Sequence, residues 1–186
     1  MITVPLACIE DLSFRPALPE EKQCAVRKLG RGITTTVYLH FKKAFWPPKM
    51  TFLFHSLSGQ VFWPARNPKV LVAYFGGAKA NAHLLKTDLV PELLRQLCVI
   101  FSKEFKDLKE LQEQLVTSEV RRWDTDPFAK MAYSYCPPGT APLRQSLQMT
   151  CGNLLWAGEA THPTKASFAH GALEEGERAA DEILSS

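Results

Sequence analysis

The chain has 186 residues, of which 46% are hydrophobic and 22% charged, and its formal net charge is +3. This composition is typical of a soluble globular protein with one sizeable core, and it excludes a disordered or fibrous chain. No basic stripe favours nucleic acid, no apolar run reaches the ~20 residues of a membrane span, and the five cysteines contain no CxxC pair for zinc.

The first segments predict a strand, a linker and a helix. Residues 2–5 have the β-branched content of a strand, and Pro5 closes it. The sequence FRPALP, residues 14–19, forms a linker. Residues 20–29 then predict a helix that ends at Gly30 and Gly32.

The middle of the chain predicts an antiparallel sheet. Residues 34–41 alternate between a more polar and a more apolar face, which is the signal of a half-buried strand. Residues 52–57, 60–63 and 70–75 are further short strands, separated by Ser-Gly and Asn-Pro and closed by Gly76-Gly77. We expect these strands to form a meander.

A helix is predicted to begin at Thr87 or Asp88, with Pro91 in its first turn. Its apolar residues recur at helical spacing, and we interpret them as core rather than as a cofactor site. Residues 106–115 predict a charged helical or irregular connector, and residues 116–123 an extended segment. The core positions are Leu94, Leu97, Cys98, Phe101 and Phe105.

The C-terminal region predicts a ligand site. Residues 154–157 suit a buried strand, Gly158 permits a sharp exit, and Glu159 places a carboxylate at the strand's end, where ligands of open α/β sheets gather. A helix is expected from Ser167, its candidate cap, with one narrow face. From the residues alone, a flavin site and ordinary packing stay open. The face consists of Leu173, Gly176, Ala180 and Ile183.

Five elements resemble the flavin-dependent amine oxidase family, which contains the monoamine oxidases, the polyamine oxidases and the lysine-specific histone demethylases. They are ITVPL (2–6), FRPALP, GRGITTTVYLHF (30–41), RRWDTDPFAKMAYSY (121–135) and GEATHPTKASFAHGAL (158–173). The resemblance is continuous from the first residue. It implies a mixed α/β (α+β) fold that is the C-terminal part of an FAD-binding amine oxidase. The implied domains are a flavin-domain segment (1–13), part of a substrate domain with an antiparallel sheet (14–115), and a second flavin-domain segment (116–186).

The resemblance implies FAD as cofactor, a small-molecule amine as substrate, and oxidation of C–N bonds with O₂ to an imine or aldehyde and hydrogen peroxide. The RWxxDP and SYSY-like elements favour the polyamine oxidase and histone demethylase branch. The GERAA sequence of residues 176–180 is shared with the monoamine type.

The resemblance also implies the site residues. Glu159 would lie near the ribityl and phosphate portion of FAD, and the backbone of Ala169 would contact the flavin. An unpaired helix N-terminus there suits a developing negative charge. Without the resemblance, Tyr133 and Tyr135 are packing neighbours on one strand face. The remaining implied residues are Pro5 and Trp123 at the flavin, and Tyr135 and Phe168 as walls around the amine.

The sequence departs from the family at three points. Thr36 stands where most members have a lysine that holds a water beside the flavin, and Met131-Ala132 replace the glycine before SYSY. No G-x-G-x-x-G element is present, so we expect an N-terminal dinucleotide-binding half elsewhere. The alternative is a non-catalytic fragment or pseudoenzyme that acts as an interaction module.

The cysteines are far apart and one is left over, which favours reduced thiols and an intracellular location, cytoplasmic or nuclear. The histidines have no partners at metal-ligand spacing, so no metal site is expected.

Overall fold

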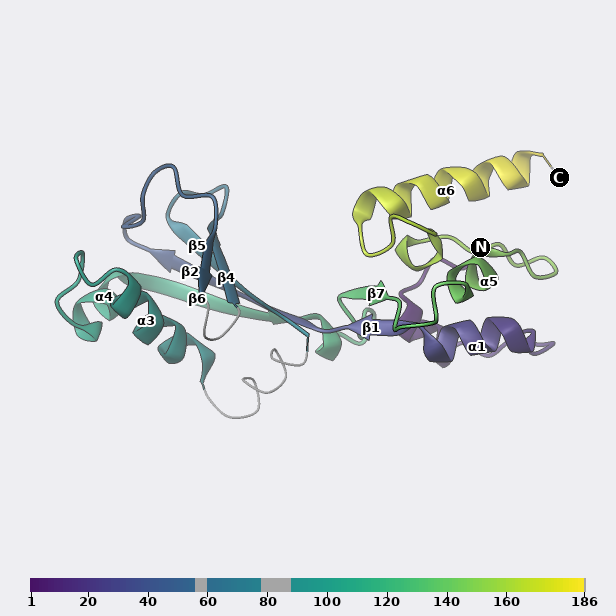
Figure 1. Ribbon diagram of the computed structural model, residues 1–186, viewed down its shortest axis with the longest axis horizontal. Coiled ribbons are helices and arrows are strands. Elements are labelled where there is room, and N and C mark those ends of the chain that lie inside the picture. The colour runs from purple at the N-terminus through teal and green to yellow at the C-terminus, as the bar shows by residue number, and fades with distance from the viewer. Residues whose placement is uncertain (56–59, 78–87, 186) are drawn as a thin grey trace. The chain divides into compact units, whose positions relative to one another are not determined.

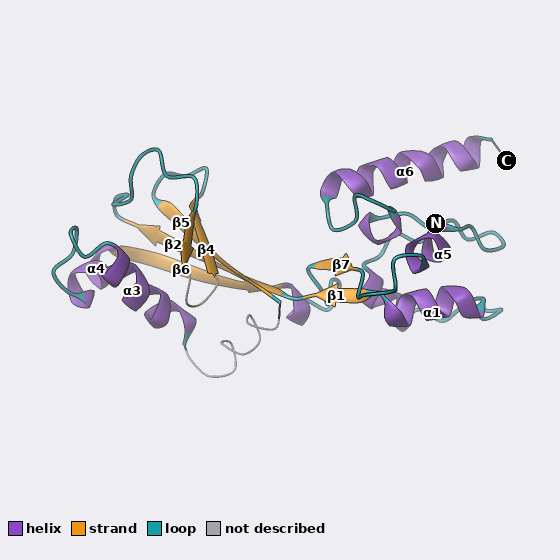
Figure 2. Cartoon of the chain, viewed as in Figure 1, coloured by secondary structure: helices purple, strands orange, loops and turns teal. Residues whose placement is uncertain are grey.

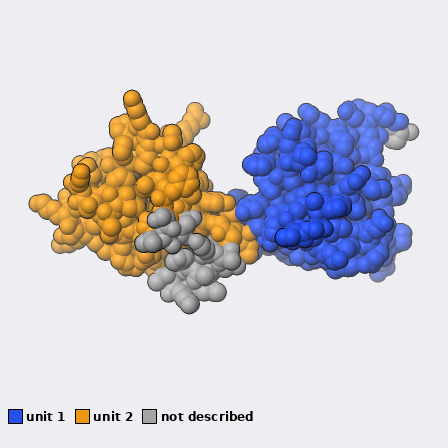
Figure 3. Space-filling model, in the orientation of Figure 1, with its two compact units in different colours: residues 1–32, 123–186 blue, residues 33–122 orange. Residues whose placement is uncertain are grey.

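The computed structural model describes residues 1–55, 60–77 and 88–185. They form a mixed α/β structure (Figures 1 and 2) with two compact units: residues 1–32 with 123–186 (unit 1), and residues 33–122 (unit 2) (Figure 3). These boundaries differ from the sequence-based division at 13/14 and 115/116. The linker and first helix belong to unit 1, because that helix packs against a helix near residue 145.

Unit 2 contains a five-stranded antiparallel sheet in the order β3-β4-β5-β2-β6. The predicted antiparallel sheet is confirmed and β3, β4 and β5 form a meander, but β2 pairs with β5 and β6 and not with β3, the next strand in the chain. The ends of two predicted elements, residues 56–57 and Thr87, lie outside the described residues. The strands are β2 (Thr34–Phe41), β3 (Leu53–His55), β4 (Gln60–Pro64), β5 (Val70–Gly76) and β6 (Leu115–Arg122).

Helices α3 (Leu89–Ile100) and α4 (Leu108–Gln114) supply the other half of the unit 2 core. The sheet face toward this core carries Val37, Leu39 and Phe41, none of which is exposed. Leu97 of α3 is also fully buried. The predicted alternation of β2 and the interpretation of the α3 leucines as core are therefore confirmed.

Unit 1 is built from short elements around a smaller core. A two-stranded antiparallel sheet pairs β1 with β7. Its elements are η1 (Leu6–Asp11), α1 (Glu20–Lys28), β1 (Gly30–Gly32), η2 (Trp123–Thr125), β7 (Tyr133–Tyr135), α5 (Leu143–Gln148), η3 (Glu159–Thr161) and α6 (Ala169–Leu184). The core residues are Leu6, Ala7, Ile9, Ala25, Val26, Leu29, Met131, Leu147, Trp156 and Ala160.

The tyrosines of β7 lie across the glycines of β1. A Cβ on Gly30 would stand 2.3 Å from the ring of Tyr135, and one on Gly32 would stand 2.5 Å from the ring of Tyr133. The GxG sequence and the YSY sequence are therefore two halves of one packing arrangement.

The predicted strands over residues 2–5 and 154–157 are wrong. The two segments share one parallel bridge between Ile2 and Trp156, where Ile2 N donates to Leu155 O at 2.8 Å and Ala157 N donates to Ile2 O at 3.0 Å. Leu154 also forms an isolated antiparallel bridge with Cys151, but neither bridge extends into a ladder among the described residues. Trp156 is nevertheless buried, as the apolar run indicated.

The predictions for the start and the buried face of α6 are also wrong. Ser167 has a φ of 72° and does not cap the helix, which begins after Phe168. Leu173 and Ile183 are exposed, whereas Glu175 is buried. The buried face was missed because its central residue is charged, and a carboxylate is buried only when partners satisfy it. That face consists of Gly171, Glu175 and Ala179.

Candidate functional site

Unit 1 contains a cavity of about 370 Å³ at the turn that follows Trp156. Its walls come from residues 3–6, from residues 123–132, from the turn at residues 157–160 and from Ala172 of α6. Side chains in the walls are mostly small and apolar, which suits a flat ring system more than a bulky polar ligand. The lining residues are Thr3, Val4, Pro5, Leu6, Trp123, Ala129, Met131, Ala132, Ala157, Gly158, Glu159, Ala160 and Ala172.

Gly158 forms the sharp turn at the cavity wall. Its φ is 120°, in the region that favours glycine, so the predicted role in the turn is confirmed. A Cβ at this position would have the carbonyl oxygen of Thr3 as its nearest neighbour, at 3.8 Å. The absent side chain therefore leaves the backbone open to the cavity.

Glu159 lines the cavity, but its carboxylate is bound to protein groups. It accepts hydrogen bonds from Ser134 N at 2.9 Å, Ser134 Oγ at 2.8 Å and Ser167 N at 2.6 Å. Ser167 Oγ in turn donates to the carbonyl oxygen of Ser134. The carboxylate thus joins β7 to the loop before α6, and it fixes the shape of the cavity wall.

Arg144 is buried and donates hydrogen bonds to the groups around Glu159. It is 5% exposed, and its Nη1 donates to Ser134 Oγ at 2.8 Å and to the carbonyl oxygen of Ala160 at 2.9 Å. Its Nε donates to the sulfur of Cys136 at 3.0 Å. A guanidinium, a hydroxyl and the Glu159 carboxylate therefore form one connected chain of charge-assisted hydrogen bonds.

The loop between η3 and α6 approaches the helix closely. A Cβ on Gly171 would lie 2.1 Å from the carbonyl oxygen of Lys165, so only glycine fits. The buried Glu175 accepts from Thr161 Oγ1 at 2.7 Å and from Gln148 Nε2 at 2.7 Å. Helix α6 is therefore fixed against the site by polar contacts.

His162 organises the same loop. Its Nδ1 accepts from the backbone N–H groups of Thr164 and Lys165, which leaves Nε2 to donate to Glu174 at 2.8 Å. Two hydrogen bonds lower the pKa of the Glu174 carboxyl, the one from Lys165 more than the one from His162. The histidine acts as a structural part of the loop.

Lys22 is a buried cation that lies over the ring of Trp156. Its Nζ donates to the carbonyl oxygens of Leu147 at 2.8 Å and Met149 at 2.5 Å, and it lies 4.3 Å from the ring centre of Trp156. Burial lowers the pKa of Lys22 to about 8. This lysine therefore ties α1 to α5 and to Trp156, two residues before Gly158.

The predicted site residues do not all meet at the cavity. Pro5, Trp123 and Glu159 meet at the cavity. Ala169, the first residue of α6, is exposed and is not among the lining residues, although Ala172 of the next turn is. The backbone position predicted for flavin contact therefore lies at the helix start but outside the cavity as described.

The two predicted aromatic walls are both solvent-accessible. Tyr135 is 47% exposed above Gly30. Phe168 is 59% exposed and stacks on His170, with ring centres 5.3 Å apart.

Thr36 belongs to unit 2. It lies on β2, on the face opposite Val37, as predicted, between Tyr74 of β5 and Arg121 of β6.

Sequence reasoning missed Ser134, Arg144 and Glu175. Ser134 lies in the middle of the YSY element, where the flanking tyrosines drew attention to packing. Arg144 and Glu175 carry no local signal, since charged residues are mostly exposed and their burial depends on partners elsewhere in the chain.

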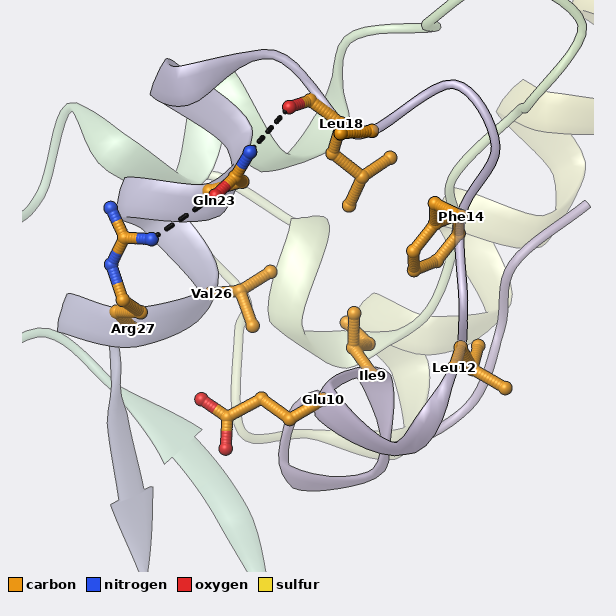
Figure 4. A pocket seen from close by; sticks show the side chains of 9 residues that line it. Ile9, Glu10, Leu12, Phe14, Leu18, Gln23, Val26 and Arg27 are labelled. Atoms are coloured by element: carbon orange, nitrogen blue, oxygen red, sulfur yellow. Dashed lines mark hydrogen bonds between the residues drawn. The ribbon is translucent and has the colours of Figure 1, made fainter.

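A second hollow in unit 1, of about 380 Å³, lies between η1, the following loop and α1 (Figure 4). Ile9, Phe14, Leu18 and Val26 point into it. The charged groups at its rim already have protein partners: Glu10 pairs with Arg31 at 2.7 Å, and Arg27 pairs with Glu20 at 2.6 Å. This hollow therefore offers an apolar surface, and these two charged groups at its rim are already paired.

Among residues 1–55, 60–77 and 88–185, no group of three His, Cys, Asp or Glu side chains is placed to hold a metal ion. In the same part of the chain, no helix has both the length and the apolar character that a membrane span requires.

Comparison with known proteins decides the family. The family model described as flavin containing amine oxidoreductase matches residues 1–184. The chain belongs to this family. It is 29% identical to peroxisomal N(1)-acetyl-spermine/spermidine oxidase of Homo sapiens and 30% identical to polyamine oxidase 2 of Arabidopsis thaliana, over 100% and 98% of its length. It is also 30% identical to lysine-specific histone demethylase 1 homolog 3 of Arabidopsis thaliana, over 99% of its length.

The fold is similar to that of cyclohexylamine oxidase from Brevibacterium oxydans, with a TM-score of 0.83 and 19% sequence identity over 99% of the chain. The chain spans 42% of that protein, 42% of the human oxidase, 38% of polyamine oxidase 2 and 12% of the histone demethylase homolog. It therefore corresponds to less than half the length of the proteins that it matches.

Proposed function

We propose that this chain supplies the ring-binding part of an FAD-dependent amine oxidase of the polyamine oxidase type. The cavity at Gly158 and Glu159 carries the proposal, since the segment that resembles the family's flavin signature forms its wall. An N-terminal dinucleotide-binding half, on the same or another polypeptide, would complete the site. The reaction would oxidise a C–N bond of an amine with O₂ and give an imine or aldehyde and hydrogen peroxide.

The residues present fit a flavin ring. Gly158 has no side chain, the neighbouring wall residues Ala157, Ala160 and Ala172 are small, and Trp123 is 49% exposed at the rim. A flat ring can therefore approach the backbone closely, and an indole can cover it. Glu159 would act indirectly, because its oxygens already hold Ser134 and Ser167.

The chemistry that FAD supplies when bound is acceptance of a hydride equivalent from the carbon next to the amine nitrogen, with O₂ as the final electron acceptor. The tasks of this chain are to position the ring, to exclude water with its apolar walls and to keep the loop before α6 in place. The network through Arg144, Ser134 and Glu159 performs the last task.

Binding of riboflavin and FAD tests the proposal. If the cavity holds the ring, riboflavin and FAD should bind with similar affinity, because the adenosine half of FAD adds no contact in this chain. Ala172→Leu fills the cavity and weakens binding of both. Ala180→Leu, on the exposed side of α6, leaves binding unchanged. Equal binding by both variants would refute the cavity as the flavin site.

Thr36 favours the second candidate, a non-catalytic member of the family. A threonine hydroxyl can bind water but provides neither a cation nor a basic amine at the position where most members carry lysine. Joined to a dinucleotide-binding half, the native chain would then bind flavin but reduce it slowly with amines. Thr36→Lys should accelerate flavin reduction in stopped-flow absorbance, and an unchanged rate would remove Thr36 as the cause.

A further inference from the structure

One face of the unit 2 sheet is covered by aromatic side chains. Directly opposed residues in an antiparallel sheet share a face, so Thr36, Tyr74 and Val61 lie on the same side, opposite the helix-covered core. The same register places Tyr38, Val72 and Trp63 on this side. Phe54 joins them through its pairing with Val61. We call this surface, with Phe52, the aromatic sheet face.

The aromatic rings form a continuous row that ends beside Thr36. The ring centres of Tyr74 and Trp63 are 5.8 Å apart, and those of Trp63 and Phe52 are 6.2 Å apart. Phe52 lies 6.2 Å from Phe54 by the same measure. Phe52 and Phe54 are 60% and 72% exposed, so a ligand can reach the row from solvent.

Few charges accompany these rings. In the described part of the sheet, the same register identifies Glu119 as the one carboxylate on this face, and it is paired with Arg121 of the same strand. A ligand with several ammonium groups would leave most of them without a carboxylate. A ligand with one ammonium and an apolar body would instead match aromatic faces, which attract cations and bury apolar surface at the same time.

We propose that the aromatic sheet face binds amines that carry a single cation on an apolar body, such as arylalkylammonium ions. The inference rests on the proposed function in one respect, namely that the complete protein oxidises an amine. It departs from the polyamine oxidase type in the preferred amine, because polyamines with several free ammonium groups would bind this surface more weakly.

Binding to the whole chain without flavin tests this inference. Phenylethylammonium, phenylethanol and spermine are each titrated, and the indole N–H resonance of Trp63 is followed by NMR after assignment with Trp63→Phe. The amine should bind about twofold to fivefold more tightly than the neutral alcohol. Spermine should bind more weakly than phenylethylammonium.

Phe54→Leu should weaken the binding of phenylethylammonium, and Phe128→Leu, which changes an 84% exposed phenylalanine of unit 1, should not. Equal affinity for amine and alcohol, tighter binding of spermine, or equal effects of the two variants would each overturn the inference. None of these results concerns the flavin cavity of unit 1, so a failure here is distinct from a failure of flavin binding there.

Discussion

The two units of this chain are stabilised in different ways. Unit 2 has a long-stranded sheet whose apolar face packs on two amphipathic helices, so burial of aliphatic and aromatic side chains dominates. Unit 1 has short elements held together by buried polar groups such as Lys22, Arg144 and Glu175. The difference shows that the part with the candidate flavin cavity depends on specific hydrogen bonds between distant segments, whereas the sheet depends on pattern and volume.

The largest effect is expected in the unit 2 core. Leu97→Ala removes a fully buried side chain of α3 and should lower the free energy of unfolding of unit 2 by about 2–5 kcal/mol. Val99→Ala, at a 76% exposed position of the same helix, should change it by less than about 0.5 kcal/mol. Urea unfolding followed by circular dichroism measures both, and similar effects would contradict the described packing.

A backbone contact should dominate in unit 1. Gly171→Ala forces a methyl group against the carbonyl oxygen of Lys165 and should destabilise unit 1 by about 1–3 kcal/mol. Gly176→Ala, five residues along the same helix with open space around it, should stabilise by up to about 1 kcal/mol. Hydrogen exchange of α6 amides measures the pair. If both substitutions changed the stability of unit 1 in the same direction, Gly171 would not be tightly packed.

The Glu159 carboxylate should stabilise the loop before α6 through the hydrogen bonds that it accepts from backbone N–H groups. Glu159→Ala leaves the backbone N–H groups of Ser134 and Ser167 without their acceptor, at an expected cost of about 1–3 kcal/mol. Glu177→Ala removes an exposed carboxylate of α6 and serves as the control. Faster exchange of the Ser134 and Ser167 amides in the first variant alone is the expected result. Unchanged exchange would assign Glu159 another role.

The buried Lys22 should make the stability of unit 1 depend on pH. Burial lowers its pKa from 10.5 to about 8 in the folded chain, so the unfolded chain binds more protons between these values. The free energy of unfolding should therefore rise from pH 8 to pH 10.5. Lys22→Met should flatten this rise, whereas Lys28→Met, an exposed change in the same helix, should keep it. A rise that survives Lys22→Met would contradict burial of a charged lysine.

The sequence predicted unit 2 well because its signals are local. The period of two in residues 34–41 and the helical spacing of Leu94 and Leu97 each arise within a single element. The order of the strands was predicted only in part, because β2 pairs with β5 and β6 rather than with β3, the next strand in the chain. The boundaries of the two units were harder to predict from the sequence, because the packing of α1 against α5 joins residues more than a hundred positions apart.

The sequence predicted the position of the candidate site but not its construction. Gly158 and Glu159 were identified through the turn and the family motif, and both line the cavity. The partners of Glu159 could not be predicted, since Ser134 and Ser167 meet it only in the folded chain. The buried face of α6 was predicted wrongly for the same reason: Glu175 is buried because Thr161 and Gln148 satisfy it.

The central claim is that the cavity behind the Gly158 turn accommodates a flavin ring. The most direct measurement adds riboflavin to the ¹⁵N-labelled chain and follows the backbone amide resonances by NMR. The account predicts that the amides of Gly158, Ala160 and Ala172 shift together and saturably. Shifts confined to the hollow around Phe14 and Val26, shifts confined to unit 2, or no shifts at all would contradict it.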